Sequence, residues 1–186
     1  MPTDHADHPA RDPFQTLGLP PRFELTPEEV RRAYMSRIAA IHPDVASDKP
    51  LDDESDASAR LHEARRVLED PESRAGALLA RFGGPGARED RSLPPGFLME
   101  IMELRERVES ILAGEAPGDR DSCRAEAKAR RSAYLREVSG LFGALSDPPT
   151  PGELGAIRTV LNAWRYIERL IEQLDPGYDP SRADFR

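Results

Sequence analysis

The 186-residue sequence has a single cysteine and no long apolar run, and each absence excludes a class of protein. Cys123 alone cannot form an intramolecular disulfide framework, which agrees with a reducing compartment, and it cannot hold a zinc ion or a metal cluster unaided. No apolar stretch reaches the roughly 18 residues that span a bilayer. The first residues, MPTDHADHPARD, mix acids with histidines, unlike a signal or transit peptide. We therefore expect a cytoplasmic protein that binds no membrane.

The chain also lacks an excess of positive charge and has only four histidines. The formal net charge of −8 argues against a nucleic-acid-binding protein that works through bulk charge. The four histidines show no HExxH spacing, so we expect no bound metal and no cofactor. What is abundant is charge, at 32% of residues, combined with apolar residues at helical spacing. This combination predicts an all-α protein.

Capping residues and apolar spacing predict the first helices. Asp12 and Pro13 open a short helix over DPFQTLGL, and Thr26 and Pro27 open a longer one. In the longer helix, apolar residues recur at spacings of four, four and three: Val30, Tyr34, Ile38 and Ile41. Pro43 ends this helix, because the residue before a proline is pushed out of the helical region.

A polar loop follows, with six acids against one lysine between Asp44 and Asp56. We expect the next helix to begin near Ala57, and Asp70 with Pro71 to open another short one. The sequence GGPG at residues 83–86 is the strongest break in the chain. We therefore place a domain boundary between about 83 and 93.

Beyond this break, three helical stretches are predicted at roughly 94–113, 121–146 and 151–174. Short connections between long amphipathic helices favour antiparallel neighbours, hence a three-helix bundle. The predicted organisation is a disordered leader at 1–11, a first domain with a connecting helix at 12–83, a linker at 84–93, a bundle at 94–174 and a tail at 175–186.

The triplet His42-Pro43-Asp44 admits several interpretations: a catalytic pair, half of a metal site, a helix terminator or a docking signal. A catalytic role needs a nucleophile or a second acid–base group, and none is obvious nearby. A small metal-dependent hydrolase built on His42, Asp44 and His62 is an alternative that metal analysis of the purified protein would test.

The surrounding sequence resembles a known family. A helix, a basic helix, HPD, a loop and a helix are the layout of the J domain, and DPFQTLGLPPRFELTPEEVRRAYMSRIAAIHPD is similar to the start of one. LEDPESRAGALLARFGG followed by FLMEIMELRERVE resembles the HscB family of iron–sulfur co-chaperones. The resemblance covers roughly residues 12–174. Family members usually carry lysine after HPD, where this chain has Val45. Their third J-domain helix usually carries an asparagine and an aromatic residue at the positions where this chain has His62 and Arg65.

The resemblance implies an L-shaped, two-domain co-chaperone without enzymatic activity of its own. The residues that would dock on an HscA/DnaK-type chaperone and accelerate its ATP hydrolysis are Arg31, Arg32, Arg37, His42, Pro43 and Asp44. A general J-domain protein, whose bundle dimerises or recruits another client, is the alternative.

The first bundle helix has apolar residues on two sides. At about 100° per residue, a buried stripe is predicted from Phe97, Ile101, Leu104, Val108 and Ile111. Leu98, Met99 and Met102 fall off that stripe, on the side of Glu103 and Glu106. Such a group is typical of a contact surface, although it could also pack against the J domain or a third helix. The resemblance implies that these five residues, with Tyr166, hold an IscU-type scaffold protein.

The other two bundle helices give simpler patterns. Ile157, Val160, Leu161, Trp164 and Ile171 form the inward stripe of the last helix, and Tyr166 is predicted to point about half a turn away from it. On the middle helix, Arg124, Lys128 and Arg131 form a basic strip. We expect that strip to pair with the acids at positions 100, 103, 106 and 109, which leaves no nucleic-acid surface.

Overall fold

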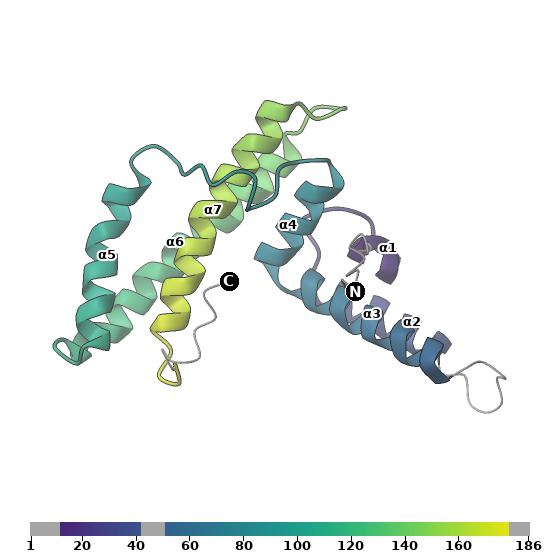
Figure 1. Cartoon of the computed structure of the whole chain (residues 1–186), viewed down its shortest axis with the longest axis horizontal. Helices are drawn as coiled ribbons and strands as arrows, with labels where there is room; N and C mark the ends of the chain where they lie inside the picture. Colours follow the sequence, from purple (N-terminus) through teal and green to yellow (C-terminus); the bar gives the residue numbers. More distant parts are fainter. Residues whose placement is uncertain (1–11, 42–50, 179–186) are drawn as a thin grey trace, which may run out of the picture. The chain divides into compact units, whose positions relative to one another are not determined.

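The computed structural model of the chain describes residues 12–41 and 51–178, with the backbone alone for residues 51–55 and 117. Within these ranges, all regular structure is helical (Figure 1). The elements are α1 (Pro13–Leu17), α2 (Pro27–Ile41), α3 (Leu51–Glu69), α4 (Pro71–Arg81), α5 (Phe97–Leu112), a 3₁₀ turn (Pro117–Asp119), α6 (Arg120–Gly143) and α7 (Pro151–Gln173). They form two compact units, Met1–Arg81 and Phe82–Arg186.

The first unit is built around α2 and α3, which pack side by side, with α1 against α3 and α4 following it (Figure 1). Its core consists of Phe14, Leu17, Phe23, Leu25, Val30, Tyr34, Leu61, Ala64, Leu68, Ala75, Leu78 and Leu79. The apolar spacing predicted from the sequence therefore selects the buried face of α2 correctly at Val30 and Tyr34.

The predicted start of α1 is confirmed by its capping bond. The Asp12 carboxylate accepts a hydrogen bond from the Phe14 amide at 2.9 Å, and Pro13 occupies the first helical position. The helix ends at Gly18, whose φ of 69° lies in the left-handed region that glycine tolerates. A Cβ at this position would also run into the guanidinium group of Arg37.

The predicted start of α2 is confirmed in the same way. The carboxylate of Glu29 accepts hydrogen bonds from the Thr26 amide at 2.8 Å and from its hydroxyl at 2.9 Å. The Glu29 amide donates back to the Thr26 hydroxyl oxygen at 3.2 Å, which completes a capping box. These bonds hold the pKa of Glu29 below its ordinary value.

The predicted start of α3 is wrong. The helix begins at Leu51 rather than near Ala57, so residues 51–56 are helical and not part of a loop. An acidic run is as compatible with the first turns of a helix as with a loop, because the helix macrodipole favours negative charge at the N-terminus. Composition alone could not separate these two possibilities.

The segment DPESRAGALL opens α4 and packs into the core of the first unit. Asp70 caps the helix by accepting a hydrogen bond from the Ser73 amide at 2.8 Å. Arg74, only 7% exposed, donates to the carbonyl oxygen of Leu68 at 2.6 Å and lies 5.3 Å from the centre of the Phe23 ring. Burial lowers the pKa of the Arg74 guanidinium.

The second unit is a three-helix bundle in which each of α5, α6 and α7 contacts the other two. The helices run antiparallel to their sequence neighbours (Figure 1). The core joining the three helices consists of Phe97, Ile101, Leu104, Val108, Ile111, Cys123, Ala127, Ala163, Ile167, Leu170 and Leu174. Burial raises the pKa of the Cys123 thiol.

The start of α7 is fixed by a second capping box. Thr150 and Glu153 exchange hydrogen bonds between side chain and backbone at 2.7 and 3.3 Å. The Ser146 hydroxyl also donates to the Glu153 carboxylate at 2.7 Å. Together these bonds lower the pKa of Glu153 to about 2.

A buried tryptophan anchors the middle of α7. Trp164 is fully buried, and its Nε1 donates to Oε1 of Glu168 at 2.6 Å. The same oxygen accepts a bond from Nε of Arg131 on α6 at 2.5 Å. The α6–α7 contact is therefore held by an ion pair as well as by apolar packing.

The ion pairs of α6 differ from those predicted. Arg131 pairs with Glu168 of α7, and Arg124 pairs with Asp175 at 3.2 Å, so neither contacts the acids of α5. Between α5 and α6 the charges are reversed, since Arg107 of α5 pairs with Glu126 of α6 at 2.8 Å. The predicted seam between the basic strip and α5 is wrong, because helix spacing gives a face but not the neighbour that the face meets.

The segment predicted as a linker is fastened to the bundle. The side-chain amide of Asn162 on α7 donates to the carbonyl oxygens of Asp90 and Ser92, at 3.0 and 2.9 Å. The chain divides between Arg81 and Phe82, just before the predicted boundary region. None of the helices within the described ranges has the length and apolar character needed to cross a membrane.

Candidate protein-binding surfaces

The outer side of α5 carries three large apolar side chains in contact with solvent. The exposed fractions of Leu98, Met99 and Met102 are 55%, 81% and 56%. The inward stripe predicted from the same helix, which begins at Phe97 and Ile101, is buried. Helical spacing therefore separates the two faces of α5 correctly.

Carboxylates border this exposed face. Glu103 and Glu106 are exposed, and among the described residues neither forms an ion pair or a hydrogen bond. Arg105 on the same helix instead pairs with Glu109 at 2.8 Å. The apolar patch consequently has negative charges beside it that are available to a partner.

The structure adds one residue that sequence reasoning missed. Leu112 is 40% exposed at the end of α5, and at about 100° per residue it lies within about 40° of Leu98 around the helix. Leu98 and Leu112 are 14 residues, or two heptads, apart, and this spacing is the sequence signal from which Leu112 could have been predicted. We refer to Leu98, Met99, Met102 and Leu112 as the α5 patch.

Tyr166 does not point away from the bundle as predicted. It is half-buried against the core, and its ring meets that of Phe97 edge-on, with 5.8 Å between the ring centres. The prediction failed because α7 packs against both α5 and α6, so its apolar face is wider than a single stripe. Ala163 and Leu170, three and four residues away, are buried with it.

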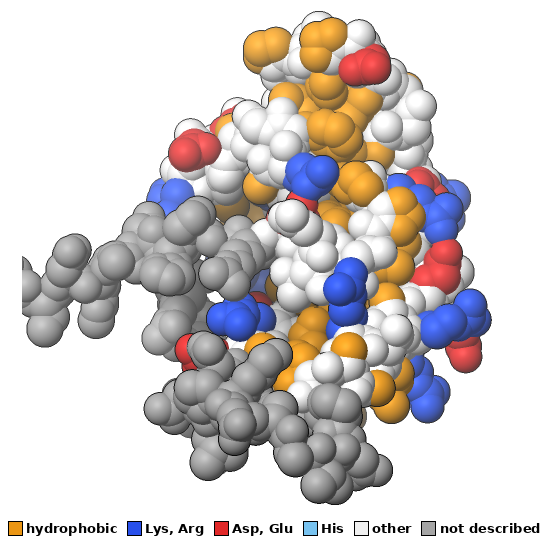
Figure 2. All heavy atoms as spheres, turned by 90° about the vertical axis from the view of Figure 1, so that its right-hand side faces the viewer, with side chains coloured by type: hydrophobic (Ala, Val, Ile, Leu, Met, Phe, Trp, Pro, Cys, Tyr) orange, Lys and Arg blue, Asp and Glu red, His pale blue; other side chains and the backbone are white. Residues whose placement is uncertain are grey.

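The three arginines predicted to dock a chaperone are all exposed on α2, but they do not share one face. At about 100° per residue, Arg32 and Arg37 lie about 100° and 240° around the helix from Arg31. The guanidinium group of Arg37 lies beside Gly18, at the end of α1. Figure 2 shows Lys and Arg side chains scattered over one face of the molecule, among hydrophobic and acidic side chains.

An apolar side chain lies among these arginines. Met35 is 54% exposed, and helical geometry places it between Arg31 and Arg32. His42, Pro43 and Asp44, the other predicted docking residues, lie outside the described residues.

Two family models match the chain. A model described as the DnaJ domain matches residues 12–76, and one described as the HSCB C-terminal oligomerisation domain matches residues 93–175. The curated co-chaperone HscB homologue of Burkholderia thailandensis is 30% identical over 165 residues, which cover 87% of this chain and 90% of that protein. The homologue of Bordetella pertussis is 31% identical over 169 residues, covering 89% and 95%. The chain belongs to the HscB family of co-chaperones.

Solved structures agree with this assignment. The chaperone HscB from Vibrio cholerae has a TM-score of 0.69 at 26% identity, covering 88% of this chain and 94% of that one. Human co-chaperone HscB has a TM-score of 0.71 at 22% identity, covering 89% and 81%, and shows the same fold. The first unit is thus an HscB-type J domain and the second the C-terminal helical domain.

Two departures from the usual HscB sequence lie together in the J domain. His62 and Arg65 occupy positions at which the resemblance led us to expect asparagine and an aromatic residue. The Tyr34 hydroxyl lies 3.2 Å from Nδ1 of His62, and the Arg65 guanidinium lies 4.9 Å from the centre of the Tyr34 ring. Both substitutions therefore maintain contacts between α2 and α3.

Two of the three residues of the alternative hydrolase site, His42 and Asp44, lie outside the described residues. Among the described residues, no group of three His, Cys, Asp or Glu side chains is arranged to hold a metal ion. His62, a component of the alternative hydrolase site, is instead engaged with Tyr34. The α5 patch with its carboxylates and the arginines of α2 around Met35 are exposed.

Proposed function

We propose that this HscB-family protein stimulates the ATPase of an HscA/DnaK-type chaperone and brings an IscU-type scaffold protein to it during iron–sulfur cluster assembly. The observation that supports the proposal best is the α5 patch, in which the large apolar side chains of Leu98, Met99 and Met102 are exposed next to one another. Solvent-exposed apolar groups of this kind mark protein–protein contact sites.

The α5 patch fits a protein partner in its chemistry. Met99 and Met102 supply flexible thioethers that adapt to the shape of a partner, and Leu98 supplies an apolar anchor. Glu103 and Glu106 at the edge complement basic residues and disfavour acidic partners. Tyr166 stabilises the first turn of α5 through its edge-on contact with Phe97.

The α2 surface suits the chaperone. Arg31 and Arg32 are exposed cations that steer an acidic partner and pair with it at the interface, and Met35 between them adds apolar contact. In our proposal, His42, Pro43 and Asp44, which lie outside the described residues, complete the docking site, and the Asp44 carboxylate accepts hydrogen bonds from the chaperone. Arg37 contributes to the proposed interface from the side of α2 where its guanidinium group lies beside Gly18.

The protein acts by bringing two partners together and transfers no chemical group. The two surfaces belong to separate units of one chain, so binding of the scaffold raises its effective concentration near the bound chaperone. The ATPase of the partner then receives both its activator and its client in one encounter.

The scaffold assignment is tested by replacing Leu98 and Met102 together with alanine. We expect the affinity for an IscU-type scaffold to fall at least about 30-fold, because loss of two anchors costs about 2 kcal/mol or more. Isothermal titration calorimetry measures this effect. The matched control is Met35→Ala, which removes an equally exposed methionine from the other unit and should leave scaffold binding intact. Unchanged affinity in the double variant would refute the assignment.

The chaperone assignment is tested by Asp44→Asn, which removes the charge with little change in shape. We expect the variant not to stimulate the partner ATPase, even at concentrations at which the wild-type protein gives full stimulation. A second variant, Arg31→Glu with Arg32→Glu, should weaken stimulation in a salt-dependent way. Its control is Arg136→Glu on α6, an exposed charge reversal of the same kind. Normal stimulation by Asp44→Asn would exclude the proposed docking site.

A further inference from the structure

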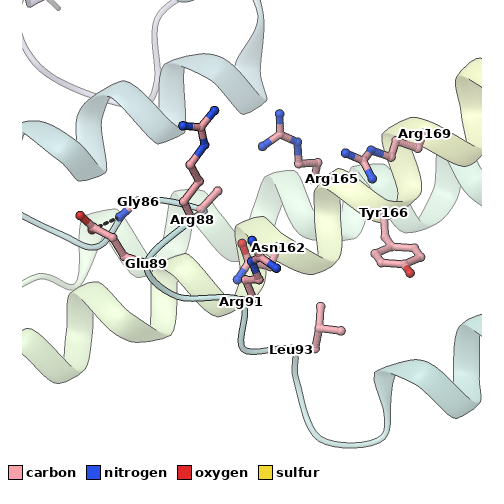
Figure 3. Close-up of a pocket in the computed structure, with 10 residues that line it drawn as sticks. Gly86, Arg88, Glu89, Arg91, Leu93, Asn162, Arg165, Tyr166 and Arg169 are labelled. Atoms are coloured by element: carbon pink, nitrogen blue, oxygen red, sulfur yellow. Dashed lines mark hydrogen bonds between the residues drawn. The ribbon is translucent and has the colours of Figure 1, made fainter. Parts of the chain in front are cut away.

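A groove runs along the C-terminal half of α7, opposite the segment that precedes α5. It has a volume of about 880 Å³ and lies within the second unit (Figure 3). Its walls include four arginines, Arg88 and Arg91 from the segment and Arg165 and Arg169 from α7. Tyr166 and Leu93 provide apolar surface in the same groove.

The groove is strongly basic in a protein whose net charge is −8. Among its lining residues Glu89 is the only acid, and its carboxylate accepts a hydrogen bond from the Gly86 amide at 2.7 Å. In Figure 3 the guanidinium groups of Arg88, Arg165 and Arg169 form a row, with Tyr166 below them. The side chains of the four arginines are all exposed to solvent.

The groove is held in shape by hydrogen bonds. Asn162 donates to the carbonyl oxygens of Asp90 and Ser92, which fastens the segment to α7. Within the segment, the amides of Glu89 and Asp90 donate to the carbonyl oxygen of Gly86, each at 3.1 Å. The backbone that carries Arg88 and Arg91 is thus ordered before a ligand arrives, which reduces the entropic cost of binding.

We propose that this groove binds a short acidic peptide segment of a partner protein. Guanidinium groups pair with carboxylates through two parallel hydrogen bonds, and a row of arginines matches successive Asp and Glu side chains along an extended peptide. Tyr166 and Leu93 accommodate an apolar side chain within the same segment. The proposal does not depend on the identity of the scaffold or of the chaperone.

Two other anionic ligands fit less well. A nucleic acid carries its charge over a long polymer, which the net charge of −8 repels outside the groove. A free phosphate ion is small and does not use a groove of this length or its apolar side. A short peptide places its charges at the arginines and little charge elsewhere.

The test uses the full chain and a fluorescein-labelled octapeptide of alternating Glu and Asp, with binding measured by fluorescence anisotropy at low salt. The variant Arg88→Glu with Arg165→Glu is expected to weaken binding at least about tenfold, through loss of two ion pairs and the added repulsion. The control is Arg60→Glu with Arg136→Glu, which changes the net charge equally at exposed positions on α3 and α6. Equal weakening by both double variants, or no binding to the wild type, would overturn the proposal.

Two further measurements separate a peptide site from other outcomes. Arg88→Gln with Arg91→Gln changes only the segment before α5 and should also weaken the octapeptide, while circular dichroism shows the bundle unchanged. The unlabelled competitors are an eight-nucleotide oligothymidylate and inorganic phosphate. We expect neither to displace the octapeptide at equal concentration. Stronger competition by either one would overturn the peptide assignment in favour of nucleic acid or phosphate.

Discussion

The two segments that carry the family resemblance most specifically have opposite locations in the structure. In α4, the residues of RAGALL are buried: Arg74, Ala75, Leu78 and Leu79. In α5, the residues Leu98, Met99 and Met102 of FLMEIMELRE face solvent. Both segments carry the resemblance to the family, yet one maintains the core of the J domain and the other forms a surface. A sequence motif therefore indicates which residues are important, and their burial indicates whether they stabilise the core or form a surface.

The difference follows from the apolar pattern of each helix. In α4 the large apolar residues collect on one side, and that side is covered by the first unit. In α5 they occupy two sides, while the neighbouring helices cover only the stripe from Phe97 to Ile111. An apolar surplus that the neighbouring helices leave exposed is the property that distinguishes a binding helix from a packing helix.

The largest effect on stability is expected from Leu78→Ala in α4, and Leu98→Ala in α5 is the matched variant for comparison. Leu78 is almost fully buried, so its truncation should reduce the free energy of unfolding of the first unit by about 2–5 kcal/mol. The same truncation at Leu98 should cost less than about 0.5 kcal/mol in the second unit. Hydrogen exchange of backbone amides in each unit measures both. Equal losses in free energy of unfolding for the two variants would contradict the contrast between α4 and α5.

A smaller loss is expected from Arg74→Ala. This change removes a hydrogen bond to the Leu68 carbonyl oxygen and the stacking on Phe23, at a cost of about 2 kcal/mol to the first unit. Arg60→Ala, at an exposed position on α3, is the control and should be neutral. If urea unfolding gives the same midpoint for both variants, the arginine of the α4 segment is not structural.

Glu153 tests whether a residue near the surface can also have a structural role, because it caps the start of α7. Because its pKa falls to about 2 on folding, its contribution is complete above the ordinary value of 4.5 and is lost as the pH falls towards 2. Glu153→Ala should therefore lower the thermal midpoint by about 2–4 °C at pH 7, with a difference that shrinks below pH 4.5. Circular dichroism melts at pH 7, 4 and 2.5 check this. A difference in thermal midpoint that is as large at pH 2.5 as at pH 7 would contradict it.

The smallest effect is expected from Leu112→Ser at the end of the α5 patch. The side chain is exposed, so unfolding should change by less than about 0.5 kcal/mol. Leu112 lies about 21 Å along the helix from Leu98, which places it at the rim of the proposed scaffold interface. Calorimetry should show less than about a threefold loss of scaffold affinity. A loss of affinity as large as that of the Leu98 and Met102 double variant would indicate that Leu112 lies at the centre of the scaffold interface and not at its rim.

Most of the fold followed from local signals in the sequence. Capping pairs such as Thr26 with Glu29 depend on neighbours three residues apart, and the structure confirms the helix that begins there. The buried side of α5 followed from helical spacing for the same reason. These features are determined within a few turns of chain, so a single sequence contains the information needed.

Features that depend on distant parts of the chain were predicted less well. Arg131 pairs with Glu168 and not with α5, and Tyr166 packs against Phe97, because the order of helices around the bundle decides these contacts. The arginine groove escaped prediction because Arg88 and Arg165 are 77 residues apart in the sequence and meet only through folding. The α5 patch, confined to one helix, could be found.

The fully buried Trp164 has a practical consequence for measurements on this protein. It is the only tryptophan in the chain and lies in the second unit, so intrinsic fluorescence excited at the indole band reports on the bundle alone. Far-ultraviolet circular dichroism, by contrast, sums the helices of both units. A denaturant titration followed by both signals will therefore show directly whether the J domain and the bundle melt together or one after the other.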